Sequence, residues 1–76
     1  MDRSIKTITE EIVKDWTKPY FGAVPYINAM KKLDKITDNF YQDSADSIVR
    51  YFLANAKTWR GETAKRIKIE LNNLIK

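Results

Sequence analysis

The sequence of 76 residues contains neither histidine nor cysteine. Without an imidazole there is no ordinary general base near neutral pH, and without a thiolate there is no cysteine nucleophile, disulfide or Cys/His zinc site. Both residue types are rare, so a short chain can lack them by chance. The absence nevertheless removes several classes of chemistry and leaves charge, aromatic rings and helix faces to carry a function.

Glycine and proline are also scarce, with two of each, and this leaves little turn chemistry for an all-β chain. No apolar run approaches the roughly 20 residues of a membrane span, and the N-terminus lacks the apolar segment of a signal peptide. A content of 43% hydrophobic and 32% charged residues is typical of a folded domain. We therefore expect one helical domain over residues 1–76, with the cytoplasm as its default location.

Apolar residues recur at a helical spacing along most of the chain, as Ile5, Ile8 and Ile12 do in the first segment. Ser4 or Thr7 can cap that segment, because either hydroxyl can accept a hydrogen bond from a free N–H group. The spacing predicts an all-α fold, a compact four-helix domain with helices over roughly residues 5–17, 25–41, 44–56 and 60–75.

Two details of this fold stay open at the level of sequence. Short connections favour packing between sequential helices, and the unequal helix lengths favour an irregular bundle or an orthogonal array over a regular up-and-down bundle. The last helix can begin at Thr58 or after Gly61, since the residues between them fit either start.

The net charge of +4 lies entirely in the last quarter of the chain. Residues 1–18 and 19–56 each hold four acids and four bases, whereas residues 57–76 hold six bases and two acids. On a helical wheel, Lys65, Lys68 and Lys76 fall on one exposed strip. Such an asymmetry suggests an anionic partner. The candidate contacts for nucleic acid or another anion are Lys57, Arg60, Lys65, Lys68 and Lys76.

A solubilising face explains the same strip without any partner, and it is the commoner role for such residues. A lysine at a helix C-terminus, such as Lys76, also complements the helix dipole. The junction before the last helix resembles a helix-turn-helix only weakly, because Glu62 would lie near the phosphates.

Aromatic residues gather between the first and second predicted helices, where Trp16, Tyr20, Phe21 and Tyr26 surround both prolines. We expect Trp16 and Phe21 to fill the corner between the two helices. Tyrosine can keep its hydroxyl in water while its ring packs, and Tyr51 falls off the buried face of its helix. The candidate protein interface is therefore Tyr20, Tyr26 and Tyr51.

Trp59 stands two residues before Gly61, at the junction of the last two predicted helices. An exposed stacking or cation–π site is one interpretation of this position. A tryptophan beside a glycine at a helix junction more often anchors packing, and we expect that role here.

Motifs for catalysis are missing from the sequence. Asp34 and Asp38 form an acid pair, but glycosidase-type chemistry needs a cleft that a small bundle does not offer. Asp38, Asn39 and Asp43 lack the spacing of a calcium loop, and neither phosphate-binding glycine motifs nor a nucleophile elbow occurs. We expect no catalytic residue, no cofactor and no metal ligand. The sequence favours a small non-enzymatic helical protein-interaction module, and a homodimer is one form that such a module can take. The alternative is a nucleic-acid-binding accessory protein that uses the basic face of its C-terminal helix.

Overall fold

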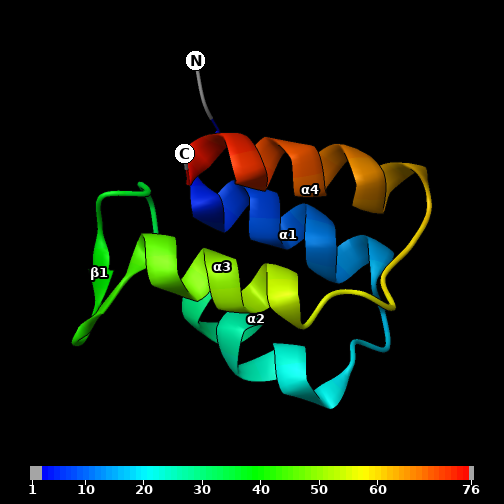
Figure 1. Cartoon of the computed structure of the whole chain (residues 1–76), viewed down its shortest axis with the longest axis horizontal. Coiled ribbons are helices and arrows are strands. Elements are labelled where there is room, and N and C mark those ends of the chain that lie inside the picture. The colour runs from blue at the N-terminus through cyan, green and yellow to red at the C-terminus, as the bar shows by residue number, and fades with distance from the viewer. Residues whose placement is uncertain (1–2, 76) are drawn as a thin grey trace.

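A computed structural model describes residues 3–75, and helices dominate it (Figure 1). The expected fold class is confirmed as mostly helical, although a short antiparallel hairpin stands between the second and third α-helices. In chain order the elements are α1 (Ile5–Asp15), the 3-10 turn η1 (Phe21–Ala23), α2 (Val24–Met30), β1 (Asn39–Phe40), β2 (Asp43–Ser44), α3 (Ala45–Ala54) and α4 (Glu62–Leu74).

α1 begins where its cap was expected. The Ser4 hydroxyl accepts a hydrogen bond of 3.1 Å from the Thr7 N–H, so Ser4 is the cap and Thr7 belongs to the first turn. The buried hydroxyl of Thr9 donates to the Ile5 carbonyl at 2.7 Å, which satisfies its only donor. The helix ends at Asp15, two residues before the predicted end, as the chain turns toward Pro19.

The predicted helix over residues 25–41 is wrong, because α2 ends at Met30. The chain beyond Met30 closes the start of α1: the carbonyls of Asp34 and Leu33 accept hydrogen bonds of 2.9 Å from the N–H groups of Ile5 and Lys6. These N–H groups belong to a first helical turn, which has no partners of its own. Residues 33 and 34 therefore bind the start of α1, which is distant in sequence, and do not continue α2.

Asp38 organises the turn that follows. Its carboxylate accepts hydrogen bonds from the N–H groups of Asp34 (3.1 Å) and Lys35 (2.9 Å). Both bonds lower the pKa of Asp38, and the bond from Lys35 has the larger effect. A hairpin follows, in which Asn39 pairs with Ser44, and its tip carries Tyr41 at a positive φ of 57°. Leu33, Ile36 and Phe40 still pack on the core from this non-helical stretch, which explains their helix-like spacing.

The starts of α3 and α4 use different devices. The Ser44 hydroxyl caps α3 by accepting from the Ser47 N–H at 3.1 Å. α4 begins at Glu62, directly after Gly61, whose φ of 116° and ψ of 180° lie in a region that is essentially reserved for glycine. The last helix therefore starts after Gly61 and not at Thr58.

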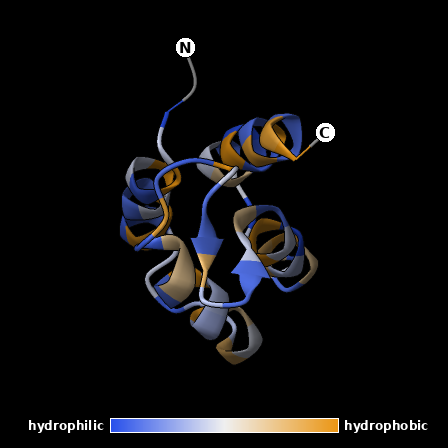
Figure 2. Ribbon diagram, turned by 90° about the vertical axis from the view of Figure 1, so that its left-hand side faces the viewer, coloured by the Kyte–Doolittle hydropathy of each residue, from blue (hydrophilic) through white to orange (hydrophobic). Residues whose placement is uncertain are grey.

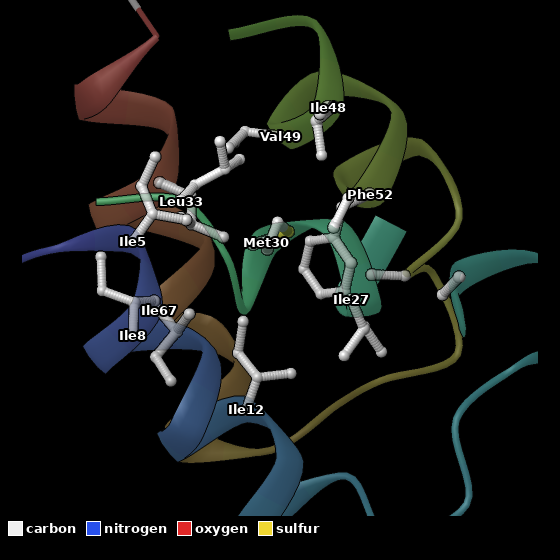
Figure 3. Packing of buried hydrophobic residues seen from close by; sticks show 14 of the residues in the cluster. Ile5, Ile8, Ile12, Ile27, Met30, Leu33, Ile48, Val49, Phe52 and Ile67 are labelled. Atoms are coloured by element: carbon white, nitrogen blue, oxygen red, sulfur yellow. The ribbon is translucent and has the colours of Figure 1, made fainter. Parts of the chain in front are cut away.

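The core lies where the apolar faces of the helices meet (Figure 2). The side chain of Met30 lies near its centre (Figure 3). α1 packs against α4 and α2, while α2 packs most closely against α3. α1 supplies its predicted stripe, represented by Ile8, and α3 and α4 supply apolar stripes represented by Phe52 and Ile67, all 0% exposed. Ile27 adds a core residue from α2.

Candidate functional site

Two connections meet at one end of the molecule, on the right of Figure 1: residues 16–20, which lead to η1, and residues 55–61, which lead to α4. The indoles of Trp16 and Trp59 stack across them, with centroids 5.7 Å apart and planes 10° apart. Phe52 meets both rings edge-on, at 6.3 Å. We call these two connections, together with the first turns of α4 (residues 62–68), the loop end.

Trp59 is the structural anchor of the loop end, as predicted. Its side chain is 2% exposed, and its Nε1–H donates to the carboxylate of Asp15 at 2.8 Å. Trp16 is half-buried and also packs at the corner where it was expected. The stack fixes the positions of the exposed residues on both connections, because it joins them through rigid rings.

Four of the five predicted anion contacts lie at the loop end. Arg60, Lys65 and Lys68 line a hollow of about 560 Å³, which Glu62 also borders. The Lys68 ammonium donates to the Trp59 carbonyl at 2.6 Å and lies 5.9 Å from the centroid of the Trp59 ring. Burial, and then the charge of Arg60, lower the pKa of Lys68. Lys57 lies on the same connection as Arg60, three residues earlier, and is exposed.

Along the predicted basic strip of α4, Lys65 is exposed and Lys68 is partly buried. Lys68 folds back toward Trp59, and the Asn72 side chain donates to the Lys68 carbonyl at 2.8 Å. Lys76 lies outside the described residues. The cations therefore gather around the first turns of α4, because its neighbouring connection adds Lys57 and Arg60 there.

Other cations are neutralised between α1 and α4. Arg3 donates to both carboxylate oxygens of Glu70, at 2.9 and 2.6 Å, and to Glu11 at 2.9 Å. Arg66 donates to Glu11 as well. We call these four residues the α1–α4 seam. The hydrogen bonds from Arg66 and then Arg3 lower the pKa of Glu11, and the bonds from Arg3 lower the pKa of Glu70.

Arg60 differs from the other arginines in its surroundings. Arg50 pairs with Asp46 at 2.6 Å and donates to the Ile75 carbonyl at 2.7 Å, and Arg3 and Arg66 belong to the seam. Among residues 3–75, Arg60 is the one arginine that forms no ion pair. Sequence reasoning missed the seam, because Arg3 and Glu70 lie 67 positions apart and no local pattern links them.

The expectation that Phe21 fills a corner is wrong, since its side chain is 80% exposed. In the tight turn of η1 the inward position belongs to Ala23, which is 0% exposed, and Phe21 is left on the outside. Its ring packs on that of Tyr20, which is 45% exposed, with centroids 4.7 Å apart. The Tyr20 ring in turn lies against Gly22, where an added Cβ would be 2.6 Å from it.

The other two predicted interface tyrosines, Tyr26 and Tyr51, form a second ring pair, between α2 and α3. Tyr51 is exposed, as expected, and its ring centroid lies 5.6 Å from that of Tyr26. The side chain of Asn55 donates to the Tyr51 carbonyl at 2.8 Å and lines a hollow of about 280 Å³ together with Tyr20 and Lys57. We call Tyr20, Phe21, Tyr26 and Tyr51 the aromatic row. It leads directly to the loop end.

Other kinds of site receive no support from residues 3–75. In this part of the chain no cluster of three or more acidic side chains is arranged to bind a metal ion. None of the helices formed by these residues has the length and apolar character that crossing a membrane requires. The chain matches no known protein family, no curated protein and no solved structure.

Proposed function

We propose that this chain is a small non-enzymatic interaction module, acting in the cytoplasm, and that it binds a protein partner through the aromatic row. The observation that carries this proposal is the exposure of Phe21 (80%) and Tyr51 (54%) on rings that already pack against Tyr20 and Tyr26. Such rings lose little conformational freedom on binding, and tyrosine in particular is a frequent anchor of protein interfaces.

A second copy of the chain is the partner that we propose first. A standard interface buries about 800 Å² per partner, which is about 15% of this molecule's surface of 5225 Å². A small domain has a limited core and gains stability from association. A twofold symmetric contact would place the aromatic row of one protomer against that of the other, so each exposed ring is used twice.

Sedimentation velocity at tens of micromolar tests the homodimer. We expect the wild type to contain dimer and the double variant Phe21→Ser, Tyr51→Ser to be monomeric. Tyr41→Ser is the matched control, because Tyr41 is 86% exposed at the hairpin tip, away from the row. A wild type that is monomeric throughout, or a Tyr41 variant that dissociates equally, contradicts the homodimer.

The second candidate function is nucleic-acid binding at the loop end. The observation that favours it is the separation of charges: Arg3 and Arg66 are neutralised in the seam, whereas Arg60 and Lys65 face solvent without a carboxylate partner among the described residues. Phosphates would supply the missing counter-charge, and each contact would release counterions.

Salt distinguishes the two candidates. A contact between aromatic rings is insensitive to ionic strength, while binding to phosphates weakens steeply as salt increases. We expect dimer formation to persist between 50 and 200 mM salt if the first candidate is right. Binding of a labelled oligonucleotide that disappears over the same range supports the second.

A further inference from the structure

We infer that the loop end and the Tyr20–Phe21 pair form one site for single-stranded nucleic acid. In this site Phe21 stacks on a base, while Lys57, Arg60 and Lys65 contact phosphates. The inference rests on the second of the two proposed functions and names its class of ligand.

The aromatic pair and the cations are neighbours on one surface. Tyr20 lines the same hollow as Lys57 and Thr58. The Trp16–Trp59 stack joins the two connections that supply Tyr20 and Lys57, and Arg60 directly follows Trp59. A strand passing over the loop end would therefore meet an aromatic platform and cations in succession, which is the arrangement that sequence-independent binding of single strands requires.

The charge of this end is strongly one-sided. The two connections and the first turns of α4 carry six bases and one acid: Lys18, Lys57, Arg60, Lys65, Arg66, Lys68 and Glu62. Of the six bases, Arg66 is paired with Glu11 in the seam. Asp15 of α1 lies beside them, and it already accepts the Trp59 Nε1–H. Glu62 borders the cationic hollow and reduces its charge without cancelling it. A polyanion is therefore the partner whose charge complements this surface.

The exposure of Phe21 favours a single strand over a duplex. A ring that is 80% exposed gains by stacking only on a base whose face is free, and base pairs inside a duplex have both faces covered by their neighbours. Reading a duplex usually needs an exposed helix that enters the major groove. Beyond Lys68, however, the described outer face of α4 carries Ile69 and Asn72 and no further base.

The platform is held in place before binding. The Tyr20 ring rests on Gly22. The Phe21 ring packs on the Tyr20 ring, with the two ring planes 53° apart. The molecule measures only 29 × 28 × 19 Å, so we expect its site to hold about 4 nucleotides, at the lower limit for small single-strand binding folds.

Fluorescence anisotropy with labelled oligothymidylate and oligouridylate, and with a duplex of equal length, tests the inference. We expect the single strands to bind more tightly than the duplex. About three phosphate contacts give a slope of log affinity against log salt of about −2 for a single strand. Affinity should therefore fall roughly 20-fold between 50 and 200 mM salt.

Two variants separate stacking from charge. Phe21→Ser should weaken single-strand binding about tenfold and leave the salt slope unchanged, because the lost term is stacking on a base. Lys57→Glu, Lys65→Glu should flatten the slope by about 1.4, because two of the phosphate contacts are lost. The matched controls are Tyr41→Ser, an equally exposed ring on the hairpin, and Lys6→Glu, a charge reversal near the start of α1. Both controls should bind like the wild type.

The possible failures are distinguishable. No binding of any oligonucleotide at low salt overturns both the nucleic-acid function and this inference. Equal binding of single strand and duplex, with no effect of Phe21→Ser, overturns the inference and leaves the nucleic-acid function standing. If a polyglutamate peptide binds as tightly, with the same dependence on Phe21, the occupant is an acidic protein segment and the inference is wrong.

Discussion

The α1–α4 seam and the loop end share α4, yet their charges have opposite surroundings. In the seam, Arg3 reaches both Glu11 and Glu70, and Arg66 completes the network. At the loop end, Arg60 and Lys65 have no carboxylate within ion-pair distance in the described chain. A charge that is paired inside the fold contributes to holding helices together, whereas an unpaired one is available to another molecule. The comparison therefore separates charges that serve the fold from charges that can serve a partner.

The largest expected effect concerns the support beneath the loop end. Trp59→Ala removes a buried ring that contacts Trp16 and Phe52, and we expect it to lower the free energy of unfolding by about 3–5 kcal/mol. Urea unfolding followed by circular dichroism measures the loss. Trp59→Phe keeps a ring and loses the hydrogen bond to Asp15, so it should cost less. A Trp59→Ala protein as stable as the wild type would mean that the loop end does not depend on the stack.

Gly61→Ala comes next. A φ of 116° places Gly61 where a Cβ causes strain, and we expect a loss of about 1–3 kcal/mol, although the space around the added Cβ is empty. The same urea titration measures it. Lys65→Ala, an exposed change within the following helix, is the control and should leave stability nearly unchanged. An equal effect of both changes would show that backbone strain at the start of α4 is not the cause.

The seam should respond to pH in a defined direction. The pKa of Glu70 is lowered in the folded state by its hydrogen bonds with Arg3. The stability that Glu70 contributes is therefore complete above its pKa in the unfolded chain, about 4.3, and is lost as pH falls through its pKa in the folded state. Glu70→Gln should cost about 1 kcal/mol at pH 7. Its unfolding free energy should also fall less steeply than that of the wild type between about pH 5 and pH 3.

Urea titrations at several pH values provide this measurement. The matched control is Glu62→Gln, the same change on the same helix but at the loop end, which should alter stability by less than about 0.5 kcal/mol at pH 7. If the two variants lose equal stability, the paired carboxylate of the seam contributes no more to the fold than the one at the loop end, and the contrast between the two regions is wrong.

The smallest expected effect is on the outer surface. Phe21→Ser should change the free energy of unfolding by less than about 0.5 kcal/mol, because the ring is 80% exposed. Thermal and urea unfolding check this value against Trp59→Ala. A loss comparable to that of a core residue would mean that Phe21 serves the fold and not a partner.

Much of the helical framework could be predicted from the spacing of apolar residues. The faces of α1 and α3 follow directly from it, and Ser4 and Ser44 cap these helices as their sequence positions suggest. Such features depend on residues within one or two turns of each other. The exposure of Tyr51 was predictable for the same reason, since it follows from the phase of one helix.

The errors arose where distant or side-chain contacts decide the structure. The end of α2 depends on hydrogen bonds between residues 33–34 and the start of α1, and on the Asp38 carboxylate that organises the next turn. Neither changes the apolar spacing of residues 33–40. The exposure of Phe21 depends on Ala23 occupying the inward side of a turn of three residues. The candidate site was not fully predictable for a similar reason, since the approach of Lys68 to Arg60 depends on the hydrogen bond from the Lys68 ammonium to the Trp59 carbonyl.

The Trp16–Trp59 stack has a practical consequence. The chain contains two tryptophans, and both lie in this one stack, with the Lys68 ammonium 5.9 Å from the ring centroid of Trp59. Indole emission responds to nearby charge and polarity, so the intrinsic fluorescence of the protein comes almost entirely from beneath the loop end. A ligand that displaces Lys68 or covers Arg60 should change this emission, whereas one bound at the hairpin should not. The protein thus carries its own spectroscopic label at the surface where binding is proposed.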